Sequence, residues 1–427
     1  MGRRNGAAAL VCGGWKGKIG EHEPDKVVFG GRSTHAVGEG VGRAGASSII
    51  SRHVGADSMQ FIDLKTQYLA YQAEIDAAMK DVVDTVRFIN GPWIGDLERD
   101  LAAFVGVKHA IGVSSGTDAL LALLMSWGIG PGDEVITTAF TFIATAEVIA
   151  LVGAKPVFVD IEPDTLNIDP VKVEAAITPN TKLILPVSLY GQCADYVALN
   201  AIGAKYGIPV LEDACQSLGS SFQGKRSCAL TEAAATSFFP AKPLGCFGDG
   251  GMVFTDNDEL AEKVRQVKDH GQSARYQHGF LGINGRLDSI QAAVLGAKLP
   301  HFQDEIDARQ RIANRYIEGL QGHVQTPIIR AGNISVFAQF TVRVANRDAV
   351  QKVMGEHGVP TAVHYPIPLP HQPVFKAIRA KSGEAEPCFP ESEKAAAEVM
   401  SLPMHPFLSE ADQDKVVETL IQAVKGA

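Results

Sequence analysis

Short apolar segments alternate with helical segments along residues 109–255, and this order constrains the fold more than any other feature of the 427-residue chain. Runs such as 134–138 and 251–255 are rich in residues that favour strands, and the stretches between such runs have the apolar spacing of helices. Because parallel neighbouring strands need a crossover connection, usually a helix, we predict an α/β fold with a mostly parallel sheet covered on both faces. The expected strands are 109–113, 134–138, 156–160, 183–187, 209–212, 233–238 and 251–255, and the expected helices before and between them are 69–88, 95–104, 115–127, 142–152, 171–177 and 194–206.

The last third of the chain has a different order of elements. A long helix is expected over 288–320, with a kink at Pro300, because proline removes a backbone donor from a helix. We therefore expect a large α/β domain at 59–305 and a smaller α+β domain at 306–427. Its further elements are strand candidates at 337–344 and 361–363 and helices at 348–357, 391–400 and 409–424.

Residues 1–58 differ from the rest in composition. They contain 13 of the 43 glycines, and eight Lys or Arg against five Asp or Glu, without a sustained helical or strand period. The apolar patch at 7–12 is too short for a signal peptide. Ordered patterning begins at Met59, so we expect residues 1–58 to be a disordered extension or a mis-assigned start.

Composition limits the class of protein. With 46% hydrophobic and 20% charged residues the chain is typical of a globular protein, and its net charge of −9 disfavours nucleic acid and anionic membranes as partners. It contains no apolar run of about 18 residues, so no membrane insertion is expected. Six scattered cysteines without a C-x-x-C pair favour reduced thiols in the cytoplasm and no metal site.

A lysine in a glycine-rich loop follows an aspartate by 29 residues. Residues 236–251 read T-S-F-F-P-A-K-P-L-G-C-F-G-D-G-G, and residues 212–216 read E-D-A-C-Q. These are the residue types that bind pyridoxal 5′-phosphate (PLP): Lys242 to form a Schiff base with the aldehyde, Asp213 to keep the pyridine nitrogen protonated, and Ser237 to donate to the phosphate. Taken singly, such an aspartate is often a cap and such a lysine is usually solvated. Their order on strand-to-loop boundaries favours the cofactor site.

Two segments earlier in the chain contain candidates for the same site. S-S-G-T-D at 114–118 follows a strand and opens a helix, whose N-terminal N–H groups can bind a phosphate near Gly116 and Thr117. An ordinary helix cap is the alternative. Phe142 follows the strand at 134–138 and can stack on a flat cofactor ring, whereas taken alone it is more typical of a buried core residue.

Two later loops contain candidate ligands for phosphate and substrate. In G-I-N-G-R-L-D at 282–288, Asn284 can donate to a phosphate and Arg286 can pair with a carboxylate or phosphate; a capping loop with a solvated arginine is the alternative. His364 and Tyr365 lie among prolines, in a loop suited either to substrate recognition or to a structural crossing. The glycine-rich segment 245–251 contains no G-x-G-x-x-G and the chain has no P-loop pattern, which disfavours a dinucleotide-dependent oxidoreductase.

From Met59 to the C-terminus the chain resembles the DegT/DnrJ/EryC1/StrS family of PLP-dependent sugar aminotransferases. The resemblance implies the aspartate-aminotransferase fold (PLP-dependent fold type I) and a homodimer with active sites shared between subunits. The motifs that carry it, in chain order, are S-S-G-T-D-A-L at 114–120, G-P-G-D-E-V-I at 130–136, V-S-L-Y-G-Q at 187–192, E-D-A-C-Q at 212–216, S-F-F-P-A-K-P-L-G at 237–245, N-G-R-L-D at 284–288 and V-H-Y-P-I-P-L at 363–369.

The resemblance also implies a role for each candidate. Lys242 matches the Schiff-base lysine, which favours transamination because related dehydratases have histidine there, and Asp213 matches the partner of the pyridine nitrogen. Gln216 matches the residue near the ring and its 3′-oxygen. The remaining matches are Gly116, Thr117 and Ser237 as phosphate ligands, Asn284 as a phosphate ligand from the neighbouring subunit, Phe142 as the stacking aromatic, and Arg286, His364 and Tyr365 as sugar-nucleotide contacts.

Within the family the chain is most similar to aminotransferases acting on UDP-2-acetamido-2-deoxy-3-keto-glucuronic acid, with L-glutamate as donor, in bacterial O-antigen synthesis. The phrases F-I-D-L-K, V-S-L-Y-G-Q-C-A-D, K-P-L-G-C and H-Y-P-I-P-L support this subgroup. Ala241, Gly285 and Phe247 depart from the usual Ser, Ser and Tyr, which weakens the substrate assignment more than the reaction class. The alternatives are another nucleotide-linked keto sugar, such as a 4-keto-6-deoxy sugar, or a PLP-binding regulator without turnover.

Overall fold

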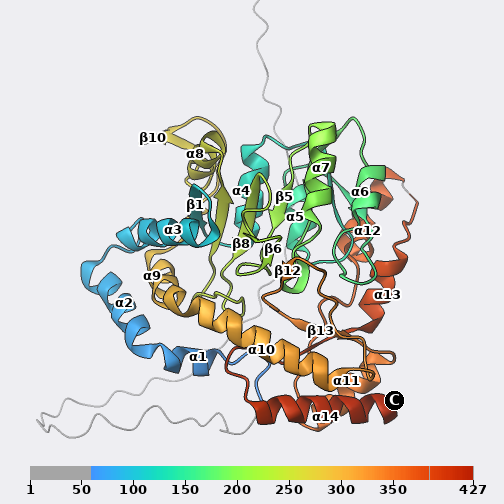
Figure 1. The fold of residues 1–427 in the computed structure, drawn as a ribbon. Coiled ribbons are helices and arrows are strands. Elements are labelled where there is room, and N and C mark those ends of the chain that lie inside the picture. The colour runs from blue at the N-terminus through green and yellow to red at the C-terminus, as the bar shows by residue number, and fades with distance from the viewer. Residues whose placement is uncertain (1–58, 384, 427) are drawn as a thin grey trace, which may run out of the picture. The chain divides into compact units, whose positions relative to one another are not determined.

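The central sheet contains strands in the order β3–β2–β4–β5–β8–β9–β1. Figure 1 labels three of these strands, β1, β8 and β5. The computed structural model describes residues 59–383 and 385–426, so the prediction for residues 1–58 lies outside the described residues. The group β3–β2–β4 joins the group β5–β8–β9–β1 through parallel bridges, Ile184 with Val210 and Val187 with Asp213. The bounds are β1 (His109–Val113), β2 (Glu134–Thr138), β3 (Lys155–Val159), β4 (Thr181–Leu185), β5 (Leu211–Asp213), β8 (Ala233–Ser237) and β9 (Gly251–Thr255).

The sheet is mostly parallel, as predicted. Strand β9 pairs antiparallel with β8 and with β1, whereas the other neighbouring pairs in this sheet are parallel. The carboxyl ends of β2, β4, β5, β8 and β1 therefore lie at one edge. Both Val113 and Ser237, the last residues of β1 and β8, pair with Gly251. The loops that contain Gly116 and Lys242 thus leave the sheet close together.

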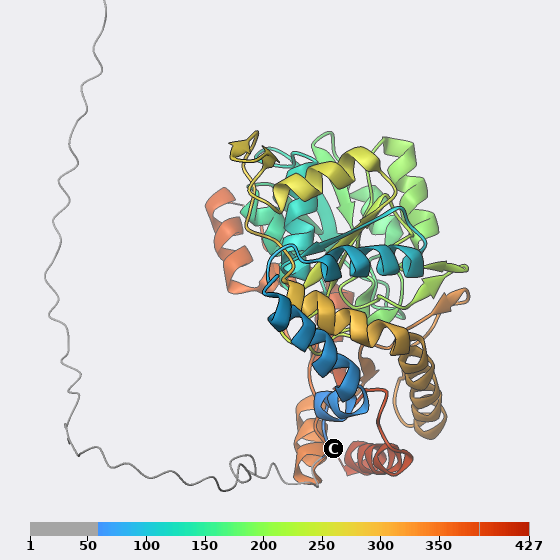
Figure 2. The same cartoon turned by 90° about the vertical axis from the view of Figure 1, so that its left-hand side faces the viewer.

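Helices cover both faces of the sheet, as Figures 1 and 2 show. Because side chains alternate along a strand, Ala234 and Phe254 belong to one buried cluster while Ala235 and Val253 belong to another. The first cluster includes apolar side chains of α3 and α9, and the second those of α4, α5 and α8. These helices are α3 (Pro92–Val105), α4 (Gly116–Ser126), α5 (Ala144–Leu151), α8 (Asp258–Val267) and α9 (Ser289–Lys298).

The C-terminal part has a hydrophobic cluster of its own. As predicted, the long helix is interrupted at Pro300: α9 ends at Lys298, and α10 (Phe302–Leu320) begins after a 3₁₀ turn, η2 (Leu299–His301). Apolar residues of α10 pack with β13, β14, α11 and α14 in that cluster. The described residues fall within one compact unit, and the division at 305/306 stays a prediction. The elements are β13 (Phe340–Arg343), α11 (Arg347–Glu356), β14 (Val399–Leu402) and α14 (Glu410–Gly426).

Several predicted elements differ in the structure. The helix expected at 69–88 is divided at Tyr71, and the helix expected at 391–400 ends at Glu398, because Val399 and Met400 pair with β13. Residues 361–363 form one bridge, from Ala362 to Ser401, rather than a strand. Helix α8 was not predicted. The remaining elements are α1 (Leu64–Ala70), α2 (Gln72–Thr85), α6 (Pro170–Ala175), η1 (Leu189–Gly191), α7 (Tyr196–Tyr206), β6 (Ser221–Phe222), β7 (Lys225–Arg226), β10 (Gln272–Ala274), β11 (Gln277–His278), β12 (Asn333–Ile334), η3 (Leu369–His371), α12 (Pro373–Ser382) and α13 (Pro390–Glu398).

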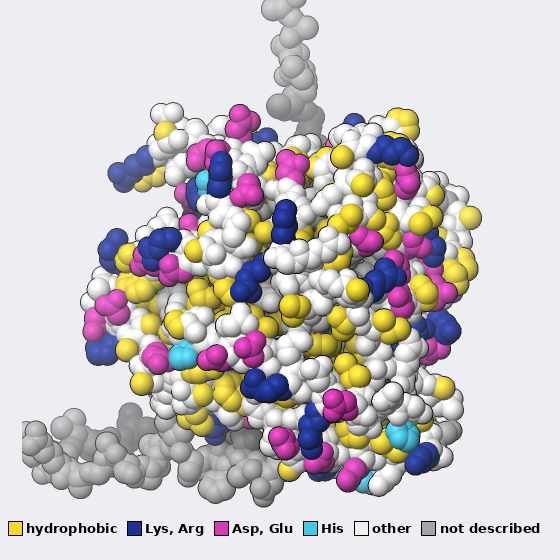
Figure 3. All heavy atoms as spheres, in the orientation of Figure 1, with side chains coloured by type: hydrophobic (Ala, Val, Ile, Leu, Met, Phe, Trp, Pro, Cys, Tyr) yellow, Lys and Arg dark blue, Asp and Glu magenta, His cyan; other side chains and the backbone are white. Residues whose placement is uncertain are grey.

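Charged side chains of both signs are interspersed on the face shown in Figure 3, so this face has no broad field of one sign. Within the described ranges, no helix combines the length and the apolar character needed to cross a lipid bilayer.

Candidate active site

Asp213 is the last residue of β5, and hydrogen bonds fix both its backbone and its carboxylate. Its backbone N–H donates to the Pro186 carbonyl at 2.9 Å, and its carbonyl accepts from the N–H of Ser188 at 3.1 Å. One carboxylate oxygen accepts from the Thr145 hydroxyl at 2.8 Å, and the other from the N–H of Cys215 at 3.1 Å. The side chain is 4% exposed. A carboxylate held in this way offers a fixed acceptor to a protonated ring nitrogen.

Lys242 lies in the loop after β8, near Asp213. Burial lowers the pKa of Lys242, while the nearby Cys215 and Asp213 act in the opposite direction. The lowered pKa increases the fraction of free amine, the form that attacks an aldehyde or accepts a proton. The structure therefore brings together the two residues that the sequence separates by 29 positions, because β5 and β8 are parallel neighbours.

The N-terminus of α4 lies against the same loops. The Ser115 hydroxyl caps the helix by accepting from the N–H of Asp118 at 3.0 Å. A Cβ atom added to Gly116 would lie 2.7 Å from the Cβ of Ser237 and 2.8 Å from the Sγ of Cys215. Glycine is therefore required for α4 to approach these loops. The resulting cradle of backbone N–H groups, with Thr117 and Ser237 beside it, suits a phosphate.

Gln216 connects the loop after β5 to the C-terminal part of the chain. Its side-chain oxygen accepts from the N–H of Tyr190 at 2.9 Å, and its amide nitrogen donates to the Tyr365 hydroxyl at 3.2 Å. Burial raises the pKa of Tyr365, and the nearby Asp213 adds to this effect, so the phenol stays neutral. The ring of Phe142, 53% exposed, lies 6.0 Å from that of Tyr365, centroid to centroid.

His364 lies beside Tyr365 in the same group. Its Nδ1 is 2.9 Å from the Ser401 hydroxyl, and its backbone carbonyl accepts a hydrogen bond from the Tyr190 hydroxyl. Burial lowers the pKa of His364 to about 4, and the positive charge of Lys242 contributes. His364 is thus a neutral imidazole at physiological pH, close to Lys242.

Asn284 and Arg286 lie on a loop beside the end of β1, where the Ser114 N–H donates to the Gly285 carbonyl at 3.0 Å. Arg286 pairs with Asp269 at 2.5 Å, and its backbone bridges to Val113; the exposed Asn284 bridges to Asp269 through its backbone. Within the described residues, neither side chain has a recorded contact with Asp213 or Lys242. Arg286 instead lines a cavity of about 380 Å³ with a different set of residues, among them Asn90, Glu98, Arg265 and Lys268.

Comparisons with known proteins identify the family. The model of the DegT/DnrJ/EryC1/StrS aminotransferase family matches residues 70–421. This chain belongs to that family. A Pseudomonas aeruginosa protein named UDP-2-acetamido-2-deoxy-3-oxo-D-glucuronate aminotransferase is 55% identical over 354 residues, which cover 83% of this chain and 97% of that protein.

Two solved structures support the same conclusion. A DegT/DnrJ/EryC1/StrS aminotransferase from Brucella abortus has 43% identity and a TM-score of 0.82, over 86% of this chain and 99% of that one. NtdA from Bacillus subtilis, solved with its bound cofactor PMP, has 31% identity and a TM-score of 0.78, over 88% and 87%. The present chain is a PLP-dependent sugar aminotransferase of fold type I. The dinucleotide-dependent oxidoreductase is thereby disfavoured.

The residues of this sugar aminotransferase fit its cofactor. The cradle at Gly116 has no room for even one added carbon, the Asp213 carboxylate is fixed, and the Lys242 amine is deprotonated more easily than in water. Sequence reasoning missed Thr145, Tyr190 and Cys215 as members of this group. Tyr190 and Cys215 lie within the motifs at 187–192 and 212–216, and Thr145 lies in the helix expected at 142–152, but their contacts depend on how the strands pair.

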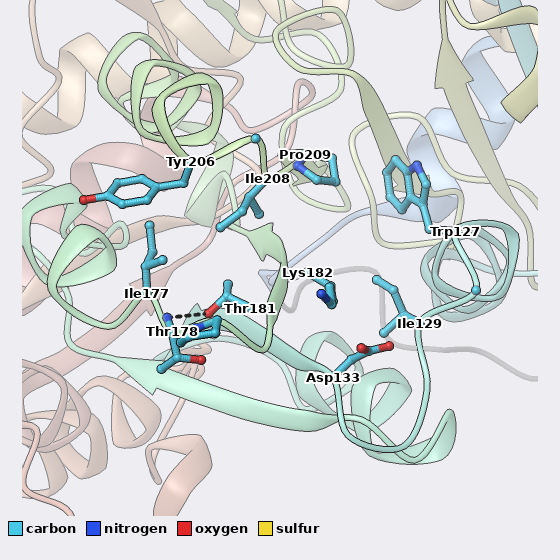
Figure 4. Close-up of a pocket in the computed structure, with 13 residues that line it drawn as sticks. Trp127, Ile129, Asp133, Ile177, Thr178, Thr181, Lys182, Tyr206, Ile208 and Pro209 are labelled. Atoms are coloured by element: carbon cyan, nitrogen blue, oxygen red, sulfur yellow. Dashed lines mark hydrogen bonds between the residues drawn. The ribbon is translucent and has the colours of Figure 1, made fainter.

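A cavity larger than that of Arg286 lies away from Asp213 and Lys242. It has a volume of about 870 Å³ and is lined by Trp127, Asp133, Lys182, Tyr206 and others (Figure 4). Asp133 immediately precedes β2, and Lys182 is the second residue of β4. The cavity is therefore at the amino ends of these strands, whereas Asp213 and Lys242 follow the carboxyl ends. Ligands of open α/β sheets bind at the carboxyl ends, so this cavity is not the active site.

Proposed function

We propose that this enzyme transfers the amino group of L-glutamate to the 3-keto carbon of a UDP-linked 2-acetamido-2-deoxy-hexuluronic acid, for a bacterial surface polysaccharide such as O-antigen. The observation that carries the proposal is the 55% identity to the Pseudomonas aeruginosa enzyme of that name across 97% of its length. The free cysteines among the described residues support a reducing compartment, the cytoplasm.

Each residue of the Asp213 group has a role in this proposal. PLP, when bound, supplies an electron-withdrawing ring that stabilises negative charge on the carbon that loses a proton. Asp213 accepts a hydrogen bond from the ring nitrogen and keeps it protonated. The amine of Lys242 moves a proton between the Cα of the amino donor and C4′ of the cofactor. Its lowered pKa makes the neutral amine available for this role.

The other side chains hold and orient the cofactor and the substrate. Gly116, Thr117 and Ser237 bind the phosphate, Phe142 covers the ring, and Gln216 contacts the ring oxygen. The Tyr365 phenol and the neutral His364 are placed to contact the sugar nucleotide, since both lie beside Gln216 or Lys242. Their roles are supported by the hydrogen bonds and charges described above.

We also propose that Asn284 and Arg286 act in the site of a second subunit of a homodimer. Within the described residues no hydrogen bond or ion pair joins their side chains to Asp213 or Lys242 of their own chain, yet these side chains are suited to phosphate and carboxylate. Three exposed apolar side chains occur in neighbouring segments. Phe88 and Ile89 precede Asn90, which lines the cavity of Arg286, and Leu281 precedes Gly282, at the start of the loop that contains Asn284. Such exposed apolar residues favour a protein interface.

The substrate is tested by mass spectrometry. The purified enzyme with PLP and ¹⁵N-labelled L-glutamate is incubated either with the UDP-linked 3-keto hexuluronic acid or with a nucleotide-linked 4-keto-6-deoxy sugar. We expect ¹⁵N only in the product of the first. ¹⁵N in the second product alone would identify a different sugar as the substrate. If ¹⁵N reaches a sugar from another labelled amino acid but not from glutamate, glutamate is not the donor.

A further inference from the structure

Glu212 is a fully enclosed carboxylate directly behind Asp213. The two residues are neighbours in β5, so their side chains leave the strand on opposite faces, and only Asp213 points to the Lys242 group. Glu212 is 0% exposed, and no lysine or arginine pairs with it in the part of the chain that the structure describes. Its carboxylate instead accepts from the hydroxyls of Ser227 at 2.7 Å, Ser188 at 2.8 Å and Ser217 at 3.5 Å, and from the N–H of Cys228 at 2.8 Å.

Two of these donors belong to the loops that form the active site. Ser188 donates its backbone N–H to the Asp213 carbonyl and lies two residues before Tyr190. Ser217 follows Gln216, whose side chain accepts from the N–H of Tyr190. The Glu212 carboxylate therefore holds two loops of the active site, the loop that contains Ser188 and Tyr190 and the loop that contains Gln216 and Ser217.

A carboxylate suits this position because one oxygen accepts from a backbone N–H while the other accepts from three serine hydroxyls. The Cys228 N–H can only donate, so the oxygen facing it must accept. Burial raises the pKa of Glu212, whereas the four donors act to lower it. Tyr196, Cys193 and Cys228 are the nearby titratable groups, and burial raises the pKa of each, so they stay neutral.

We propose that Glu212 is a positioning residue for transamination, which holds the Tyr190 loop and the Gln216 loop in register with Asp213. The proposal rests on the function proposed above, because it assumes that Asp213 and Gln216 serve the bound cofactor. Displacing such groups by about 1 Å is expected to reduce the rate without removing any group that reacts.

The test compares two buried carboxylates. Glu212→Gln keeps the shape but replaces one acceptor oxygen by an NH₂ donor, so the three serine hydroxyls that donate to that oxygen must reverse or lose their hydrogen bonds. Asp160→Asn is the matched control, because Asp160 is also buried and accepts from the hydroxyl and N–H of Ser392, but holds α13 instead of the active-site loops. The affinity for PLP, the visible circular dichroism of the bound cofactor and kcat are measured for both variants and the wild type.

We expect Glu212→Gln to lower kcat by about tenfold or more, to weaken PLP binding and to change the dichroism, while Asp160→Asn changes only the melting temperature. Should Glu212→Gln bind PLP with wild-type affinity, dichroism and kcat, the proposal is wrong. If that variant does not fold, Ser188→Ala decides, because it removes one donor and leaves the carboxylate: weaker PLP binding supports the proposal and unchanged binding overturns it. A wild-type protein that does not bind PLP would instead overturn the proposed function, and this proposal with it.

Discussion

At the scale of single residues, the partly buried amine of Lys242 leads to the most direct prediction. Replacing Lys242 by alanine removes the group that moves the proton, so we expect turnover to fall by about 10³-fold or more. Stability is expected to be retained, since burial of the ammonium group is unfavourable. Steady-state rates and thermal melts measure the two effects. Lys182→Ala is the control, because Lys182 is exposed at the amino ends of the strands and its loss should change neither. Full activity of Lys242→Ala would rule out the proposed base.

His364 leads to a prediction about acid stability. Its pKa is about 4 in the folded protein and about 6.5 in the unfolded chain, so the unfolded chain binds more protons between these pH values. This contribution to stability is complete above pH 6.5 and is lost progressively as the pH falls towards 4. Between pH 7 and pH 5 it amounts to about 2 kcal/mol of unfolding free energy. Urea unfolding at both pH values should therefore show a smaller loss for His364→Gln than for the wild type, and equal losses would contradict the assigned pKa.

At the scale of elements, α4 determines how closely a phosphate can approach the sheet. Gly116→Ala would place a Cβ atom 2.7 Å from the Ser237 side chain and 2.8 Å from Cys215, distances that require the helix N-terminus to move. We expect PLP binding to weaken by about tenfold or more, because the phosphate loses its N–H donors. Equilibrium titration with PLP measures this change.

A matched control for this glycine lies in α11. An added Cβ at Gly95 meets nothing within 4 Å, but Gly95 lines the cavity of Arg286, so the control is Gly355→Ala in α11, where an added Cβ also meets nothing within 4 Å; it should leave PLP affinity unchanged and stabilise the helix by up to about 1 kcal/mol. If the two variants bind PLP equally well, α4 does not form the phosphate cradle.

The elements also indicate how far sequence reasoning extends. The short apolar runs predicted the strands of the large sheet, because the spacing of apolar residues is a local property of the sequence. Pro300 predicted the kink, because proline lacks a backbone donor. The apolar residues Val399 and Met400 fit a helix or a strand equally well, and only pairing with β13 makes them a strand. Helix α8 was missed although Asn257 caps it and Leu260 and Val264 have helical spacing.

The candidate site shows the same limit. Lys242 and Asp213 were identified as residue types in order along the chain, but that they meet follows from β5 and β8 being neighbours, which no local pattern specifies. The hydrogen bond from Thr145 to Asp213 and that from Tyr190 to Gln216 join residues 68 and 26 positions apart. Contacts of this kind depend on strand order and could not be derived from spacing.

At the scale of the whole molecule, the chain presents its candidate ligands in two groups. Lys242, Asp213 and Tyr365 lie together, whereas Arg286 pairs with Asp269 and lines another cavity. The proposed homodimer would bring Arg286 to the cofactor site of the other subunit. In a dimer with two-fold symmetry, each subunit can supply Arg286 to the site that contains its partner's Lys242.

Mixing two inactive variants tests this arrangement. Lys242→Ala and Arg286→Ala are each expected to have little activity alone. In a mixed dimer one site contains both substitutions and the other contains neither. If subunits exchange at random, half of the dimers are mixed, so a mixture in equal amounts should recover about one quarter of the wild-type activity per site. Unfolding the two variants together and refolding them allows the exchange, and refolding each separately before mixing is the control. Recovery in neither experiment would place Arg286 and Lys242 of the same chain in one site or remove Arg286 from catalysis, and either result would contradict the shared active site.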